Sequence, residues 1–207
     1  MMFVFRRNSG ARAALIVGCT AALLFSSALP ATASDDSVAF APETAQQENG
    51  AIDPTTFEGP LVVATPSGAE LVVDVRAGKA LEVAEAIQEA DRQGSLDTLA
   101  IRTSRTGCGQ KVRSVGGIAN TWATSVQGCA VIGYPGYRRE YVWENTSDVH
   151  LCTRARGFNA GNGASWYSTG CGGGATFLVP WGNTLAYTQM QGSSMSWATG
   201  VAYLWRA

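Results

Sequence analysis

Hydrophobic and polar positions repeat with two periods between residues 60 and 106. Residues 61–63 and 71–73 are short runs of Leu and Val on either side of Pro66-Ser67-Gly68, a turn sequence, and they predict two strands. Small and aliphatic residues then recur at helical spacing: Ala80, Val83, Ala84, Ile87 and Ala90. They predict an amphipathic helix over residues 78–93, which Gly94 is placed to end.

A weak alternation over residues 96–103 predicts a third strand, so residues 60–106 are expected to form a small ββαβ unit. A unit of this size is small for independent stability, and it contains no cysteine. We therefore expect it either to pack on the rest of the chain or to serve transiently as a prosegment.

Residues 107–207 show short β-type runs between Gly-rich turns and no helical period. Many short strands at this spacing are typical of a β-sandwich or a small barrel. The expected fold class is thus mainly β. The predicted runs are 130–132, 137–144, 149–156, 164–168, 176–179, 185–190, 195–198 and 201–205.

Alternation within these runs predicts which side chains share a face of the sheet. In the run 137–144, one face carries Tyr137, Arg139, Tyr141 and Trp143. In the run 149–156, one face carries His150, Cys152, Arg154 and Arg156. The domain is therefore expected to have an aromatic core and a candidate basic face.

The N-terminal 33 residues have the features of a secretory signal peptide. A positive segment with Arg6, Arg7 and Arg12 precedes an apolar run, and Ala31-Thr32-Ala33 has the spacing of a cleavage site. Residues 34–59 are polar and poor in large apolar side chains, so they are expected to be a disordered acidic segment. With no other stretch long enough to span a membrane, we expect a secreted, extracellular protein.

Charge and aromatic residues divide the chain at about residue 107. Residues 34–106 contain 13 acidic and 5 basic residues, whereas residues 107–207 contain 3 acidic and 7 basic ones. All 6 Trp and all 6 Tyr follow residue 121. The opposite charges fit a prosegment that masks a basic domain, and they fit an ordinary two-domain protein equally well. A net charge of −1 for the whole chain gives no support to nucleic-acid binding.

Removal of the signal peptide leaves four cysteines. An even number in an exported chain predicts two disulfides, and three pairings are formally open. We expect Cys108–Cys129 and Cys152–Cys171, because each closes a loop of about 20 residues, worth roughly 3 kcal/mol. Neither paired C-x-x-C spacing nor clustered histidines are present, so no metal or other cofactor is expected.

Catalytic machinery is sparse in the basic domain. The chain has one histidine, His150, and Asp148 lies two residues away on the same strand, about 7 Å from it, too far to orient a catalytic base. Glu140 and Glu144 would lie about 13 Å apart on a straight strand, farther than a glycosidase pair requires. A small hydrolase that uses His150 is therefore only the third functional hypothesis.

The aromatic residues are the strongest positive feature. Twelve Trp and Tyr side chains exceed what one small core needs, so some should be exposed, where rings can stack on sugars. The candidates for stacking lie beside turn-like sequences and are Trp166, Tyr167, Trp181, Tyr134 and Tyr137. A candidate anion-binding cluster consists of Arg138, Arg139, Arg154 and Arg156.

Two functional hypotheses rank above the hydrolase. The first is a secreted, non-enzymatic binding protein for a carbohydrate or another cell-envelope component, such as an anionic cell-surface polymer. The second is a secreted effector, antimicrobial or similar to a protease inhibitor, that is released from the acidic prosegment.

Overall fold

The computed structural model describes residues 50–96 and 108–207, and the mainly-β fold class is confirmed. The predicted signal peptide, most of the acidic segment and all but the first residue of the predicted third strand lie outside the described residues. The helix is α1 (Ala80–Arg92). The strands are β1 (Gly59–Ala64), β2 (Glu70–Val75), β3 (Val112–Gly116), β4 (Ala123–Thr124), β5 (Ala130–Ile132), β6 (Arg138–Asn145), β7 (Leu151–Phe158), β8 (Ala164–Gly172), β9 (Gly174–Pro180), β10 (Leu185–Tyr187), β11 (Met190–Ser194) and β12 (Val201–Arg206).

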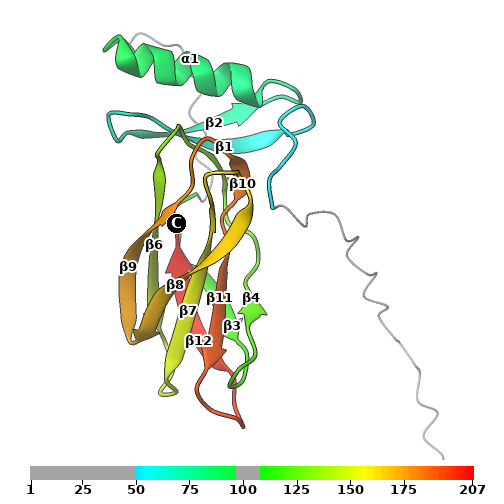
Figure 1. The fold of residues 1–207 in the computed structure, drawn as a ribbon, viewed down its shortest axis with the longest axis vertical. Coiled ribbons are helices and arrows are strands. Elements are labelled where there is room, and N and C mark those ends of the chain that lie inside the picture. The colour runs from blue at the N-terminus through cyan, green and yellow to red at the C-terminus, as the bar shows by residue number, and fades with distance from the viewer. Residues whose placement is uncertain (1–49, 97–107) are drawn as a thin grey trace, which may run out of the picture. The chain divides into compact units, whose positions relative to one another are not determined.

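The first sheet joins strands from both sides of the sequence division at residue 107. Its order is β10-β5-β1-β2, with β1 antiparallel to β2 and parallel to β5 (Figure 1). Leu61 is opposite Ala130, and Val63 is opposite Ile132. The change in composition at residue 107 therefore does not mark the end of a sheet, because the hairpin of the acidic region continues into strands of the basic region.

This sheet is covered on both faces, which explains why its strands read as continuous apolar runs. Leu61 and Val63 on β1 pack with Ala84 and Ile87 of α1 in one buried cluster. Val62, between them, points to the opposite face and belongs to a second cluster with the aromatic residues of the basic region.

The helix ends close to its predicted boundaries. Ala80, Ala84, Ile87 and Ala90 form its buried face. Gly94 has a φ of 67°, and its N–H donates to the Asp91 carbonyl at 3.0 Å, as expected of a glycine that ends a helix. Arg92 in the last turn pairs with Glu89 at 2.6 Å on the exposed side.

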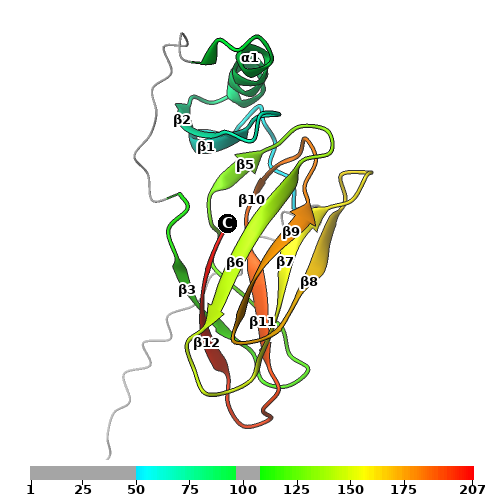
Figure 2. The ribbon, with the colours of Figure 1, turned by 90° about the vertical axis from the view of Figure 1, so that its left-hand side faces the viewer.

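The other two sheets face each other across an aromatic core. Their orders are β3-β12-β6-β9 and β4-β11-β7-β8. Figure 2 labels all of these strands except β4, which is labelled in Figure 1. One buried cluster contains side chains of both sheets. Strands β6 and β12 contribute Tyr141, Trp143 and Trp205, and strands β7 and β11 contribute Leu151 and Met190. Each of the three sheets is open, with two edge strands, and the described residues form no closed barrel; this part of the protein is a β-sandwich-like fold, one of the two predicted architectures.

Both predicted disulfides are present. Cys108–Cys129 joins the segment before β3 to the residue that precedes β5, and Cys152–Cys171 joins directly opposed residues of β7 and β8. Each closes a loop of the expected size, with sequence separations of 21 and 19.

Residues 50–59 are ordered in the structure, although the predicted disordered segment extended to residue 59. Ala51 forms a β-bridge with Ala186, and the Ile52 N–H donates to the Leu185 carbonyl at 2.8 Å. Phe57 is buried in the cluster beneath α1. Two anchoring points, rather than a high apolar content, hold this short segment on the sheet.

Candidate functional site

Trp181 is the clearest error among the predicted binding residues, because it is completely buried. Its ring packs edge-on against Phe158 with centroids 5.1 Å apart, and its indole N–H donates to the Thr184 carbonyl at 3.0 Å. The turn that should have exposed it folds back on the core, since the Trp181 backbone N–H donates to the Tyr137 carbonyl at 3.0 Å.

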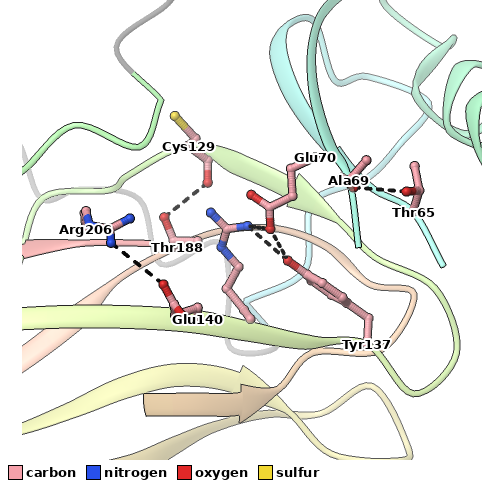
Figure 3. A network of polar contacts seen from close by, with 9 residues as sticks. Thr65, Ala69, Glu70, Cys129, Tyr137, Glu140, Thr188 and Arg206 are labelled. Atoms are coloured by element: carbon pink, nitrogen blue, oxygen red, sulfur yellow. Dashed lines mark hydrogen bonds and ion pairs between the residues drawn. The ribbon is translucent and has the colours of Figure 1, made fainter. Parts of the chain in front are cut away.

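Arg139 is also buried and cannot belong to an exposed anion-binding face. Its guanidinium forms an ion pair with Glu70 on β2 and donates to the Tyr137 hydroxyl at 3.0 Å (Figure 3). The Tyr137 hydroxyl in turn donates to Glu70 at 2.7 Å. Burial disfavours the charge of Arg139, but the interactions with Glu70 and Tyr137 together outweigh this and the pKa of Arg139 is raised.

Of the two predicted turn tyrosines, Tyr137 belongs to this network and Tyr134 contacts it only through the ring of Tyr137. Burial raises the pKa of Tyr137 to about 12, and its ring lies 5.4 Å from the ring of Tyr134. Tyr137 is engaged by Glu70 and Arg139, so it binds β2 to β6 rather than presenting a free ring to a ligand.

The four candidate arginines do not form one cluster. Arg138 is exposed on β6 and donates to the Leu178 carbonyl of β9 at 2.9 Å. Arg154 and Arg156 lie on β7, in the other sheet of the sandwich. The two glutamates of β6 pair with other basic residues, since Glu144 contacts Lys111 at 2.7 Å and Glu140 contacts Arg206 at 3.8 Å.

Arg154 and Arg156 instead interleave with two tryptophans on the outer face of the β7 sheet. The Arg154 guanidinium carbon lies 4.3 Å from the ring centroid of Trp122 and 5.8 Å from that of Trp166. The guanidinium carbon of Arg156 lies 5.5 Å from the Trp166 ring. We call these four residues, Trp122, Arg154, Trp166 and Arg156, the tryptophan–arginine strip.

Strand register explains how the strip assembles. Arg156 is opposite Trp166 and Arg154 is opposite Ser168 on the paired strand β8. Between Arg154 and Thr153 the register shifts by one residue at a β-bulge. Because of this shift, Cys152 lies opposite Cys171 rather than opposite Gly170. Tyr167 points to the other face and packs against the core, so of the predicted pair Trp166-Tyr167 only Trp166 belongs to the strip.

The two guanidinium groups of the strip have no carboxylate partner within the described ranges. None of the ion pairs among residues 50–96 and 108–207 includes Arg154 or Arg156. The Nε–H of Arg154 donates to the Gln191 side chain. Partial burial lowers the pKa of both arginines, which reflects the cost of holding these charges without a counter-ion.

A groove of about 350 Å³ adjoins the strip. Trp122 belongs to both, and Cys152 of the groove shares its face of β7 with Arg154. The groove residues are Ala119, Asn120, Trp122, Cys152, Ser193, Ser194, Met195 and Trp197. At its rim Trp197 is 71% exposed and Met195 63% exposed, and we call this feature the tryptophan groove.

Two loops hold the exposed rings of the tryptophan groove. The Ala119 N–H donates to the Ser196 carbonyl at 2.8 Å, and the Met195 N–H donates to the His150 carbonyl at 3.1 Å. Gly117 permits the tight turn before Trp122, because a Cβ atom there would lie 2.3 Å from the Thr121 carbonyl oxygen. The tryptophans are thus carried by loops that are hydrogen-bonded to each other and to the sheet.

Sequence reasoning missed Trp122 and Trp197. The run 195–198 was predicted as a strand, whereas the structure places these residues in the turn that follows β11. The available signal was the sequence Ser193 to Gly200, in which Trp197 is surrounded by small and polar residues with no large apolar neighbour except Met195.

No family model, no curated protein and no solved structure matches this chain. In the ranges 50–96 and 108–207 no group of His, Cys, Asp and Glu side chains is arranged to hold a metal ion. No helix within those ranges has the length and apolarity needed to cross a membrane.

Proposed function

We propose that the protein is a secreted, non-enzymatic binding protein whose ligand is a carbohydrate, bound in the tryptophan groove and along the tryptophan–arginine strip. The observation that carries the proposal is the exposure of Trp197, at 71%, on the rim of a groove that also contains Trp122. Exposed aromatic residues gathered beside a concave surface mark interaction sites.

The chemistry of the groove supports sugar binding. Two indole rings offer flat apolar faces, and Asn120 is exposed with a side-chain amide that makes no hydrogen bond within the described residues. A sugar presents one apolar face and a rim of hydroxyl groups, which match a ring and an amide respectively.

The same lining favours binding over catalysis. Its residues include no His, Asp or Glu, and its one cysteine, Cys152, is in a disulfide. General acid–base chemistry needs a titratable side chain within hydrogen-bond reach of the substrate. His150 contributes its carbonyl oxygen to a loop contact and is not among the groove residues.

The shared first sheet supports a working protein that keeps residues 50–96. Release of the basic region alone would expose the edge of β5 and the apolar side chains of Ala130 and Ile132, which are now buried. This physical cost weighs against an effector made of residues 107–207 alone.

Binding to insoluble polysaccharides tests the proposal. The secreted protein is mixed with chitin, cellulose or bacterial peptidoglycan, and the bound fraction is measured at several polysaccharide concentrations. Trp197→Ala should weaken binding about tenfold, because loss of one exposed aromatic contact costs on the order of 1.4 kcal/mol.

A matched control is available on the other sheet of the sandwich. Phe177 of β9 is 42% exposed and lies outside the groove, so Phe177→Ala should bind like the parent protein. The proposal is wrong if no polysaccharide is bound, or if Trp197→Ala and Trp122→Ala both bind with unchanged affinity.

A further inference from the structure

The tryptophan–arginine strip has more positive charge than stacking on a neutral sugar requires. Arg154 and Arg156 are both half-buried on β7, and no carboxylate of the described residues forms an ion pair with either. Partly buried charges normally have a counter-ion, because their loss of hydration is otherwise uncompensated. A ligand that supplies negative charge would remove this cost.

The hydrogen-bonding capacity of the strip is also incompletely used. Arg154 donates through Nε to Gln191, and its terminal nitrogens have no partner within the described ranges. The Arg156 side chain makes no hydrogen bond there at all, although its guanidinium lies over the Trp166 ring. Stacking on an indole leaves the edge of a guanidinium open, and that edge is the part that binds a carboxylate with two parallel hydrogen bonds.

The arrangement is continuous from the tryptophan groove to the second arginine. Trp122 lines the groove and lies 4.3 Å from Arg154, which in turn contacts Trp166 beside Arg156. Arg154 and Arg156 are two residues apart on one strand, so their Cα atoms are separated by about 6.6 Å along β7. An extended chain could therefore place one sugar in the groove and its neighbours along the arginines.

We propose that this surface selects a polysaccharide whose sugars carry carboxylate groups, with a neutral ring face stacked in the tryptophan groove and carboxylates bound by Arg154 and Arg156. The selectivity rests on the carbohydrate-binding function proposed above. We assign carboxylate rather than phosphate or sulfate because the strip offers two separate planar guanidinium edges and no third cation, which suits one planar, singly charged group at each arginine.

Matched polysaccharides with and without the carboxylate test the selectivity. The probes are cellulose and C6-oxidised cellulose, chitin and C6-oxidised chitin, and polygalacturonate and its methyl ester. We expect at least one carboxylated member to bind ten times more tightly than its neutral partner at 50 mM salt. The difference should shrink at 500 mM salt, where charge interactions are screened.

The variant Arg154→Gln/Arg156→Gln should remove that difference. Its affinity for the carboxylated polysaccharide should fall at least ten times further than its affinity for the neutral partner. Arg156→Gln alone, which leaves the Arg154–Gln191 hydrogen bond intact, should lose about threefold. Arg138→Gln, an exposed arginine on β6, is the matched control and should bind like the parent protein.

The outcomes separate this inference from the proposed function. Equal binding of neutral and carboxylated partners, with no effect of the arginine substitutions, overturns the selectivity and leaves carbohydrate binding in place. Cellulose sulfate bound as tightly as oxidised cellulose overturns the assignment of carboxylate. Failure of every polysaccharide to bind overturns both proposals.

Discussion

The acidic region, residues 50–96, and the basic region, residues 108–207, are stabilised in different ways. The acidic region has one hairpin, one helix and no disulfide, and its buried side chains are mostly small or aliphatic. The basic region has two disulfides and a core that contains Trp143, Trp181 and Trp205. Each buried indole N–H has a hydrogen-bond acceptor, so these large rings are buried without loss of hydrogen bonding.

The difference teaches that the two regions depend on each other unequally. The apolar side chains of the acidic region share their buried cluster with Ala130 and Ile132 of β5 and Leu185 of β10, which belong to the basic region. The basic region has its own aromatic core, but one of its strands, β5, needs β1 as a neighbour. Composition distinguishes the two regions, whereas the first sheet contains strands of both.

Removing the acidic region should have the largest effect on stability. The fragment 108–207 would expose Ala130 and Ile132 together with the β5 edge, so we expect loss of cooperative thermal unfolding and a tendency to aggregate. Calorimetry and size-exclusion chromatography would measure both. A chain of residues 44–207, which forms one compact unit, is the control.

A fragment 108–207 that unfolds cooperatively at the parent temperature would show two independent domains. It would also restore the hypothesis that the acidic region is a prosegment released from an effector.

The ion pair between the two regions should have a smaller effect. Glu70→Gln leaves the guanidinium of Arg139 buried without a counter-ion, and we expect a loss of about 1–2 kcal/mol in the free energy of unfolding. The figure lies below that for a fully buried pair, because the Glu70 side chain is 41% exposed. Urea denaturation provides the measurement.

Glu82→Gln is the matched control for that substitution. Glu82 pairs with Lys79 on the exposed face of α1, and such surface pairs contribute less than about 1 kcal/mol. Equal destabilisation by the two substitutions would contradict a specific role of the Glu70–Arg139 contact.

The smallest expected effect is on the pH dependence of stability, where a single titrating residue in each region acts at opposite ends of the pH scale. In the basic region, burial raises the pKa of Tyr203 to about 12, above the unfolded value near 10. The folded state holds that proton more tightly, so this contribution is present below pH 10 and is lost as the pH rises to 12. In the parent protein the urea concentration at the midpoint of unfolding should therefore fall between pH 10 and 12. In Tyr203→Phe this fall should be smaller.

In the acidic region the sign is reversed. Hydrogen bonds from Ser67 lower the pKa of Asp91, so its contribution is present above the unfolded pKa near 4 and is lost as the pH falls through the lower folded value. Asp91→Asn should flatten the acid side of the same curve and leave the alkaline side unchanged. Unfolding midpoints that respond to neither substitution would contradict this division.

The sequence predicted local features of the fold well because they depend on neighbours along the chain. Apolar runs located β1 and β2, helical spacing located α1, and Gly94 marked its end. The expected consecutive disulfides are present, although the sequence left three pairings open. The parallel pairing of β1 with β5 could not be predicted, because it joins residues about 70 positions apart and no turn sequence fixes its register.

The candidate site was predicted only in part. Arg154 and Arg156 share one face of β7 as expected and Trp166 lies beside them, whereas Trp181 and Arg139 are buried and Trp122 and Trp197 were missed. Proximity to a turn was a poor guide to exposure, because one turn folds on the core and another carries its tryptophan away from it.

The sequence by itself determined which side chains share a strand face and where the helix ends, because both are set by backbone periodicity and local turn residues. Only the tertiary structure decided which faces are covered, which arginines lack a counter-ion and which tryptophans meet at the groove. Those properties arise where separate strands and loops come together, and no local pattern records the partner that a face will find.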